Sequence, residues 1–262
     1  MSTTHTHAFE RLHNFRDLGG CETRHGGRLK SGLLFRSAEL HRGTDRDLAQ
    51  LRSLNLALIC DLRSPRESAR KQPRQWWEPA PRLVNVPFHD PALHDGQRRR
   101  LLGFLSRGNG ADRCREFCRQ YYQHLAFERA ERIGEVITLL ARPENQPALI
   151  HCTAGRDRTG LVAAFIQLLL GVPFATVQAE YLRTNDDTGP RIEQLLSTLR
   201  LATLAPALGR RLQLIATTQP EYLAEIHDRV LAAHGSVERY LAEACGVTRS
   251  TVQQLQQRLL SG

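Results

Sequence analysis

Lysine is nearly absent from this chain. Lys30 and Lys71 are its two lysines, so arginine supplies 34 of the 36 basic residues behind its net charge of +9. A basic balance can indicate nucleic acid or an anionic membrane as a partner. Residues 98–100 form the one dense arginine run, and it lacks the interleaved aromatic residues of single-strand binders. We therefore expect no nucleic-acid partner, and interpret the run as a solvated helix face or as a rim that attracts phosphorylated substrates.

Long hydrophobic runs are missing as well. The longest apolar stretch, residues 161–170, is too short to cross a bilayer. Residues 1–12 lack the apolar segment of a secretory signal. The six cysteines, at positions 21, 60, 114, 118, 152 and 245, show no spacing typical of a disulfide framework. We expect a cytoplasmic protein without integral membrane association; export without a cleavable signal is the alternative.

The length of 262 residues, with 41% hydrophobic and 24% charged residues, is enough to bury a full core. We expect one domain over residues 1–262, with residues 91–142 as a helical insertion or lid and residues 190–262 as a helical C-terminal part. Glycines at positions 103, 108 and 110 interrupt the expected insertion and could act as hinges. A plain surface excursion is the alternative for this segment.

Four short apolar runs predict strands, over residues 32–36, 56–62, 82–88 and 148–151. They are continuous rather than alternating, as in a parallel sheet covered on both faces. Helical patterns occur at residues 44–54, 113–124, 127–141, 158–170, 173–184, 190–202, 220–234, 236–245 and 248–260. The sequence therefore predicts an α/β fold with a central, mostly parallel sheet flanked by helices.

The most informative segment is residues 151–160, which read His-Cys-Thr-Ala-Gly-Arg-Asp-Arg-Thr-Gly and place a cysteine and an arginine at Cys-x5-Arg spacing. A predicted strand precedes it and a predicted helix follows. This order predicts an anion site, because backbone amides in the loop and the positive end of the helix dipole would converge on one phosphate. The expected phosphate-binding residues are Thr153, Ala154, Gly155, Arg156, Asp157 and Arg158.

Cys152 would lie directly beneath the bound phosphate. The positive field that holds the phosphate also favours thiolate over thiol. We therefore expect Cys152 to attack phosphorus and form a phosphocysteine, which water then hydrolyses. A buried structural cysteine at the end of a strand is the alternative.

The loop resembles that of the cysteine-dependent protein tyrosine phosphatases. Residues 14–20 (Asn-Phe-Arg-Asp-Leu-Gly-Gly), 33–40 and 61–67 are similar to motifs of a bacterial branch, the atypical tyrosine phosphatase family 3, and residues 235–241 also resemble it. The likeness covers about residues 9–260. It implies a tyrosine-phosphatase-like fold, helices over the active site, and hydrolysis of phosphotyrosine, with phosphoinositide activity in some members.

Carried onto this sequence, the resemblance implies Cys152 as the nucleophile and Arg158 as phosphate ligand and transition-state clamp. His151 would support the loop and the thiolate by hydrogen bonding. The hydroxyl of Thr159 would assist departure of the thiolate in the second step. Capping of the following helix is the alternative role for Thr159.

The general acid is an open assignment, since the chain has no Trp-Pro-Asp segment ahead of the cysteine. Asp157 lies inside the loop, as in lipid-active members of the family, and Asp90 resembles the acid of phosphoinositide phosphatases. Neighbouring arginines lower the pKa of a carboxyl group, which opposes an acid role for Asp157, whereas a bound phosphate dianion raises it. We favour Asp157; Asp90 is a turn residue in the alternative interpretation.

Asp61, Arg63 and Arg16 are expected close to the loop, where they could form an ion-pair network with Asp17 and Arg36. We interpret this set as structural support for the loop. A ligand for a second phosphate among them is the alternative.

These residues predict a phosphate-monoester hydrolase that needs no metal or cofactor and releases inorganic phosphate. Phosphotyrosine proteins are the first-choice substrates, with dual specificity open, and phosphoinositides are the alternative. Arg156 leaves room for a polyanionic substrate, although phosphoinositide-active members of the superfamily usually carry lysine there. Two other classes are a catalytically silent module that binds phosphorylated partners, and sulfur or arsenate chemistry at the same loop.

Two further cysteine patterns are weaker signals. Cys114 and Cys118 are four residues apart with His124 beyond, which could hold a metal, but two buried cysteines on one helix face account for the spacing. Cys60 ends a predicted strand and could form a disulfide with Cys152 on oxidation.

Overall fold

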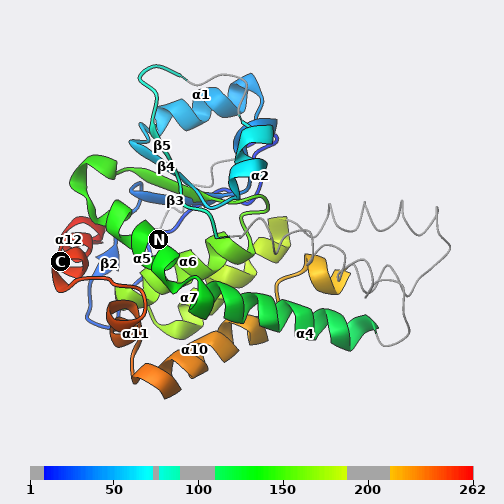
Figure 1. Cartoon of the computed structure of the whole chain (residues 1–262). Coiled ribbons are helices and arrows are strands. Elements are labelled where there is room, and N and C mark those ends of the chain that lie inside the picture. The colour runs from blue at the N-terminus through cyan, green and yellow to red at the C-terminus, as the bar shows by residue number, and fades with distance from the viewer. Residues whose placement is uncertain (1–8, 73–76, 89–109, 188–212, 262) are drawn as a thin grey trace.

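The computed structural model describes residues 9–72, 77–88, 110–187 and 213–261. At its centre is a five-stranded sheet with the order β1-β3-β6-β4-β5 (Figure 1). Its strands are β1 (Arg16–Asp17), β3 (Leu34–Ser37), β4 (Leu58–Asp61), β5 (Arg82–Asn85) and β6 (Ala148–His151). All neighbouring pairs are parallel except β1 and β3. The predicted α/β fold with a mostly parallel sheet is confirmed.

Helices lie on both sides of this sheet, with α1 and α2 on one side and α5, α6 and α7 on the other (Figure 1). The helices before β6 are η1 (Leu40–Arg42), α1 (Asp45–Ser53), α2 (Pro65–Arg70), α4 (Gly110–Gln123), the π-helical turn η2 (His124–Glu128), α5 (Ala130–Ala141) and η3 (Pro143–Asn145). Those after β6 are α6 (Asp157–Leu169), α7 (Phe174–Leu182), α10 (Pro220–His234), α11 (Val237–Glu243) and α12 (Arg249–Leu259). No helix within these described ranges is both long and apolar enough to span a membrane.

The central strands separate two hydrophobic cores because successive side chains of a strand point to opposite faces. In β6, Ala148 and Ile150 belong to the large core, and Leu149 between them belongs to the small one. In β4, Leu58 and Cys60 alternate with Ile59 in the same way. Continuous apolar runs are therefore needed here, since both faces of these strands are covered.

Two helices on the small-core side begin with reciprocal caps. The Thr44 side chain accepts from the amide of Asp47, whose carboxylate accepts from the amide of Thr44, and α1 begins at the next residue, as predicted. Ser64 and Glu67 form the same capping box at α2, where Pro65 occupies the first helical position. These local signals fix the direction in which the chain leaves β3 and β4.

Most predicted elements agree with the structure to within a few residues. Strand β5 stops at Asn85 instead of residue 88, and its side chains are largely exposed because it is the edge of the sheet. The predicted helix at residues 190–202 lies outside the described residues, as do Asp90 and the part of the expected insertion up to residue 109.

The C-terminal helices share the large core with the sheet, and we infer that they belong to the same domain. Strand β7 (Leu260–Ser261) pairs antiparallel with β2 (Arg28–Leu29), which ties the last described residues to the segment between β1 and β3. Leu241 and Leu255 are buried in the large core. Gly134 of α5 approaches the backbone of Cys245 so closely that a Cβ at this position would lie 1.8 Å from its carbonyl oxygen.

We expect Gly134→Ala to destabilise the protein by about 2 kcal/mol, because the added methyl group has to displace the backbone at Cys245. In an ordinary helix interior the same change stabilises the protein by about 1 kcal/mol. The sign of the change in the free energy of unfolding therefore tests the close packing at Gly134. Urea unfolding monitored by circular dichroism measures the difference, with Glu131→Ala on the exposed face of α5 as the control. An unchanged or higher midpoint for Gly134→Ala would show that the C-terminal helices do not pack as described.

Candidate active site

The loop with the Cys-x5-Arg spacing lies at the carboxyl edge of the parallel strands, where ligands bind in open α/β sheets. Cys152 directly follows β6 and is 2% exposed, and α6 begins five residues later at Asp157. Gly155 has a φ of +63°, and a Cβ there would lie 2.3 Å from the carbonyl oxygen of Ser37. The turn therefore requires glycine for its dihedral angle and for its close approach to β3.

The carbonyl groups of the loop all accept hydrogen bonds from the scaffold around it. The Asn14 side chain donates to the carbonyls of Ala154 and Gly155 at 3.1 and 2.8 Å. Arg36 donates to the Gly155 carbonyl at 2.6 Å. The amide of Glu39 donates to the Thr153 carbonyl at 3.2 Å. These bonds orient the peptide units with their oxygens outward.

The backbone amides of residues 153–159 show the opposite pattern. None of these seven consecutive amides donates a hydrogen bond to another residue in the part of the chain that the structure describes. Buried amides are nearly always paired, and helix N-termini bind anions through such groups. The loop thus presents a row of unpaired donors beside Cys152, as an anion site requires.

A buried charge cluster supports the loop from below. Glu180 of α7 accepts from Arg16 at 2.5 Å and from Arg36 at 2.9 Å, and Arg16 also donates to the side chain of Asn14. Asn14 has a φ of 54°, a left-handed conformation that asparagine tolerates better than most residues. Burial and the neighbouring Arg36 lower the pKa of Arg16 to about 10. The two guanidinium groups thus share one buried carboxylate behind the loop, and the half-exposed Asp187 lies 4.0 Å from Arg16.

Arg158 is already paired with a carboxylate. Its guanidinium donates to both oxygens of Glu67 at 3.1 and 3.4 Å, and Glu67 also accepts from the Thr153 hydroxyl at 2.7 Å. Burial alone would raise the pKa of Glu67, but the Arg158 charge outweighs it and holds that pKa well below its usual range. Glu67 therefore keeps its charge and orients Arg158 toward the loop.

Asp157 and Arg156 form the second ion pair of the loop. Arg156 donates from Nε and Nη2 to the Asp157 carboxylate at about 3.0 Å, and its Nη1 donates to the carbonyl of Ala216. Tyr122 of α4 donates its hydroxyl to Asp157 Oδ1 at 2.8 Å. Burial would raise the pKa of Asp157, but Arg156 and these hydrogen bonds lower it overall. In the absence of an anion Asp157 is thus held in its ionised form.

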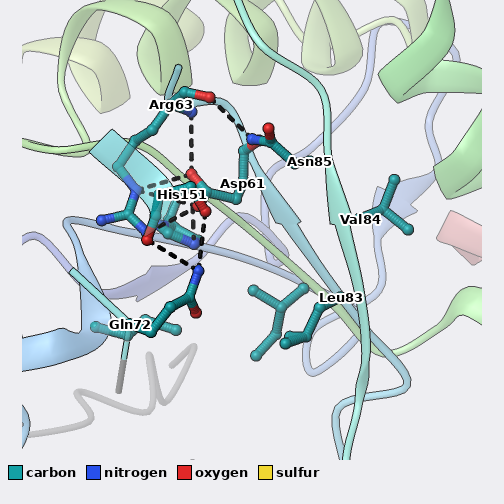
Figure 2. A pocket seen from close by; sticks show the side chains of 10 residues that line it. Asp61, Arg63, Gln72, Leu83, Val84, Asn85 and His151 are labelled. Carbon is teal, nitrogen blue, oxygen red and sulfur yellow. Dashed lines mark hydrogen bonds and ion pairs between the residues drawn. The ribbon is translucent and has the colours of Figure 1, made fainter. Parts of the chain in front are cut away.

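His151, Asp61 and Arg63 lie side by side on the small-core face of the sheet (Figure 2). Arg63 donates to both oxygens of Asp61, and His151 Nε2 is 3.9 Å from Asp61 Oδ1. Burial lowers the pKa of His151. Its Nδ1 lies 3.3 Å from the Cys152 carbonyl, and because a carbonyl oxygen only accepts, Nδ1 is the donor in this hydrogen bond. The three residues line a cavity of about 180 Å³ together with Gln72. Of these residues, His151 contacts Cys152, through its carbonyl and not through its sulfur.

Thr159 is fully buried, and its hydroxyl has no hydrogen-bond partner among the described residues. The N-cap of α6 is Arg156, and no side chain caps the helix. The capping role that the sequence left open for Thr159 is therefore wrong. An unpaired buried hydroxyl in the first turn of α6 is suited to make a new hydrogen bond during the reaction.

The expected insertion contributes to the site through α4. Besides Tyr122, this helix carries Tyr121, whose pKa is raised by burial and on which the charges of Arg158 and Asp157 also act. The neighbouring Cys114 is fully buried, and no group of three metal-ligating side chains occurs within the described ranges. All six cysteines, Cys60 and Cys152 included, are free thiols.

The sequence did not single out four contributors to the site, namely Asn14, Glu67, Glu180 and Tyr122. Asn14 and Glu67 lie in the segments 14–20 and 61–67, which resemble family motifs. The Ser-x-x-Glu spacing of residues 64–67 also indicates a capping box. Glu180 and Tyr122 occur in ordinary helical patterns, where nothing local marks them. A buried glutamate facing two distant arginines becomes visible only when the chain is folded.

Comparison with known proteins gives a consistent result. A sequence model of the tyrosine phosphatase family matches residues 7–261. The triple specificity protein phosphatase PtpB of Mycobacterium tuberculosis is 32% identical over 272 aligned residues, covering 94% of this chain and 96% of the relative. A tyrosine-protein phosphatase of Nostoc commune is 28% identical over 235 residues, covering 86% and 73%. Among solved structures, the core catalytic domain of the PP-IP phosphatase SIW14 from S. cerevisiae matches 58% of this chain and 70% of its own at 18% identity, with a TM-score of 0.35.

We expect Glu67→Gln to lower the stability at pH 7 by about 1 kcal/mol, since hydrogen bonds to charged groups contribute at least that much. Because the folded-state pKa of Glu67 is depressed, its contribution is present above the ordinary glutamate value of about 4.3 and fades as the pH falls below it. The difference in the free energy of unfolding between wild type and Glu67→Gln, measured with urea, should therefore become smaller as the pH is lowered. The exposed Glu144→Gln serves as the control, and a gap independent of pH would contradict the ion pair.

Proposed function

Because the chain belongs to the tyrosine phosphatase family, we propose that it hydrolyses its substrates through a covalent phosphocysteine formed on Cys152. It is a phosphatase, so its substrates are phosphorylated molecules and one product is inorganic phosphate. The proposal concerns which residues carry the reaction and which phosphate esters they select.

In the first step the Cys152 sulfur attacks phosphorus and the bond from phosphorus to the ester oxygen breaks. The departing oxygen takes a proton from Asp157, while Arg158 and the loop amides hold the other phosphate oxygens. In the second step water attacks phosphorus, gives its proton to the Asp157 carboxylate, and releases phosphate as the sulfur–phosphorus bond breaks. Thr159 donates a hydrogen bond to the sulfur as it regains its negative charge.

The observation that carries the proposal is the polarity of the loop. Its carbonyls are tied to Asn14, Arg36 and Glu39, whereas seven amides next to Cys152 have no partner in the described chain. A phosphoryl group in transfer spreads negative charge over its equatorial oxygens. Donors fixed in advance stabilise such charge without reorganisation, which is the largest contribution in many enzymes.

Asp157 is a better candidate for the general acid than Asp90. It stands in the loop itself, and its carboxylate is fixed by Arg156 and Tyr122. Asp90 lies outside the described residues. The pKa of Asp157 is lowered in the ligand-free site, and the charge of a bound dianion would raise it toward the range that an acid needs.

Phosphotyrosine proteins are the proposed substrates, with dual specificity as an extension. Phosphoinositides use additional cations for additional phosphates, but the guanidinium of Arg156 is committed to Asp157 and to the Ala216 carbonyl. The printed name of the mycobacterial relative, a triple specificity phosphatase, favours a broad range of esters. We also propose a cytoplasmic location, which six free thiols favour.

We expect Cys152→Ser to lower the turnover of a phosphotyrosine peptide by at least about 10³-fold, because the serine hydroxyl is not ionised by the site. Cys21→Ser, which changes a thiol away from the loop, is the matched control. Acid-quenched wild type should carry phosphate on Cys152 in a mass spectrum. Equal turnover by Cys152→Ser and wild type would refute the mechanism, and faster turnover of a phosphoinositide in vesicles would refute the substrate assignment alone.

The acid assignment predicts a dependence on the leaving group. Asp157→Asn should slow phenyl phosphate, a poor leaving group, by about 10²-fold, and p-nitrophenyl phosphate much less, since only the poor leaving group needs the proton. Asp90→Asn should change both rates alike. The reverse pattern in steady-state assays would assign the acid to Asp90.

A further inference from the structure

Two buried tyrosine hydroxyls connect the proposed general acid to the surrounding helices. Tyr122 of α4 donates to Asp157 Oδ1 at 2.8 Å, and Tyr181 of α7 donates to the Tyr122 hydroxyl at 2.5 Å. Both tyrosines are 1% exposed. The chain therefore runs in one direction, from Tyr181 through Tyr122 to Asp157.

We propose that Tyr122 is a positioning residue for Asp157 and that Tyr181 fixes the direction of the Tyr122 hydroxyl. This inference rests on the proposed role of Asp157 as general acid. It adds a residue from α4, a helix far from the loop in sequence, to the machinery for the leaving group.

The two oxygens of the Asp157 carboxyl group have different partners. Oδ1 accepts from Tyr122 at 2.8 Å and from Arg156 Nε at 3.1 Å. Oδ2 lies 3.0 Å from both Nε and Nη2 of Arg156. Arg156 thus contacts both oxygens, whereas Tyr122 binds one of them. Among the described residues, Tyr122 is therefore the side chain that fixes the carboxyl group from outside its own loop.

The two tyrosine hydroxyls form a chain with one direction. The Tyr122 oxygen accepts the proton of Tyr181, so its own proton is free to point to Asp157. Without Tyr181 the Tyr122 hydroxyl could rotate away from the carboxylate. Burial raises the pKa of both tyrosines well above the usual range, so both hydroxyls keep their protons at neutral pH.

Packing holds this chain rigid. The Tyr122 ring lies between the rings of Tyr181, at a centroid distance of 6.2 Å, and Tyr222, at 5.4 Å. The ring of Tyr181 contacts α6 at Gly160, where a Cβ would lie 3.0 Å from it. Asp157 is therefore oriented by α4 and α7 as well as by its own loop, through the Tyr122 and Tyr181 hydroxyls.

The test compares Tyr122→Phe, Tyr181→Phe and Tyr222→Phe. We expect Tyr122→Phe to lower kcat for phenyl phosphate by about tenfold, with less effect on p-nitrophenyl phosphate and a KM within about twofold, because the carboxyl group loses the bond that orients it. Tyr181→Phe should act in the same direction by about threefold. Tyr222→Phe removes a hydroxyl from the same ring cluster without touching Asp157, and should leave both rates unchanged.

The Asp157→Asn background separates a positioning role from a structural one. There Tyr122→Phe should have no further effect that depends on the leaving group, since the group it positions is gone. An equal loss with both substrates, or the same loss in the Asp157→Asn background, would overturn the inference. Should Tyr122→Phe fail to fold, Tyr181→Phe decides, because it keeps the Tyr122 side chain and removes only the hydroxyl that directs it.

Failure of the proposed function has a different signature. If Asp157→Asn itself shows no selectivity for the poor leaving group, the acid assignment and the inference fall together. If Asp157→Asn is selective and neither tyrosine variant is, only the inference falls.

Discussion

The site depends on one constraint, namely that the peptide units of residues 153–156 keep their carbonyl oxygens turned away from the space above Cys152. Each of these carbonyls has a fixed donor outside the loop, including Asn14 and the guanidinium of Arg36. A peptide unit that directs its oxygen outward directs its amide inward. The orientation of the amides in the proposed anion site is therefore set by side chains that do not bind the anion themselves. Changing Asn14 or Arg36 would alter this orientation without removing a ligand of the anion.

Fixing these carbonyls requires buried charge, which is costly unless it is paired. Arg36 reaches the Gly155 carbonyl from β3 and needs Glu180 to be stable there, and Arg16 shares the same carboxylate. This explains why motifs separated by more than a hundred residues occur together in one chain. The loop is supported by one hydrogen-bonded cluster, formed by Asn14, Arg16, Arg36 and Glu180. The hydrophobic contacts of α7 bring Glu180 into place.

Local patterns were sufficient for most of the fold and for the loop itself. Continuous apolar runs marked β3, β4 and β6, and Thr44 marked the start of α1, because these signals depend on near neighbours. The sequence could not show that α4 supplies the hydroxyl on Asp157, or that Glu67 pairs with Arg158, because those contacts depend on how helices pack across the sheet. The edge position of β5 was equally hidden, since exposure of a strand depends on strand order.

The charge balance of the site explains how a carboxylate with a lowered pKa can act as an acid. Arg156 is neutralised by Asp157, and Arg158 by Glu67, so neither guanidinium offers uncompensated charge to an incoming dianion. The loop amides and the cluster of Arg16, Arg36 and Glu180 face the two negative charges of the dianion, and Asp187 lies 4.0 Å from Arg16. Asp157 is the carboxyl group within the loop, and a neighbouring dianion raises the pKa of a carboxyl group. We therefore propose that binding of the substrate dianion protonates the group that its departing oxygen requires.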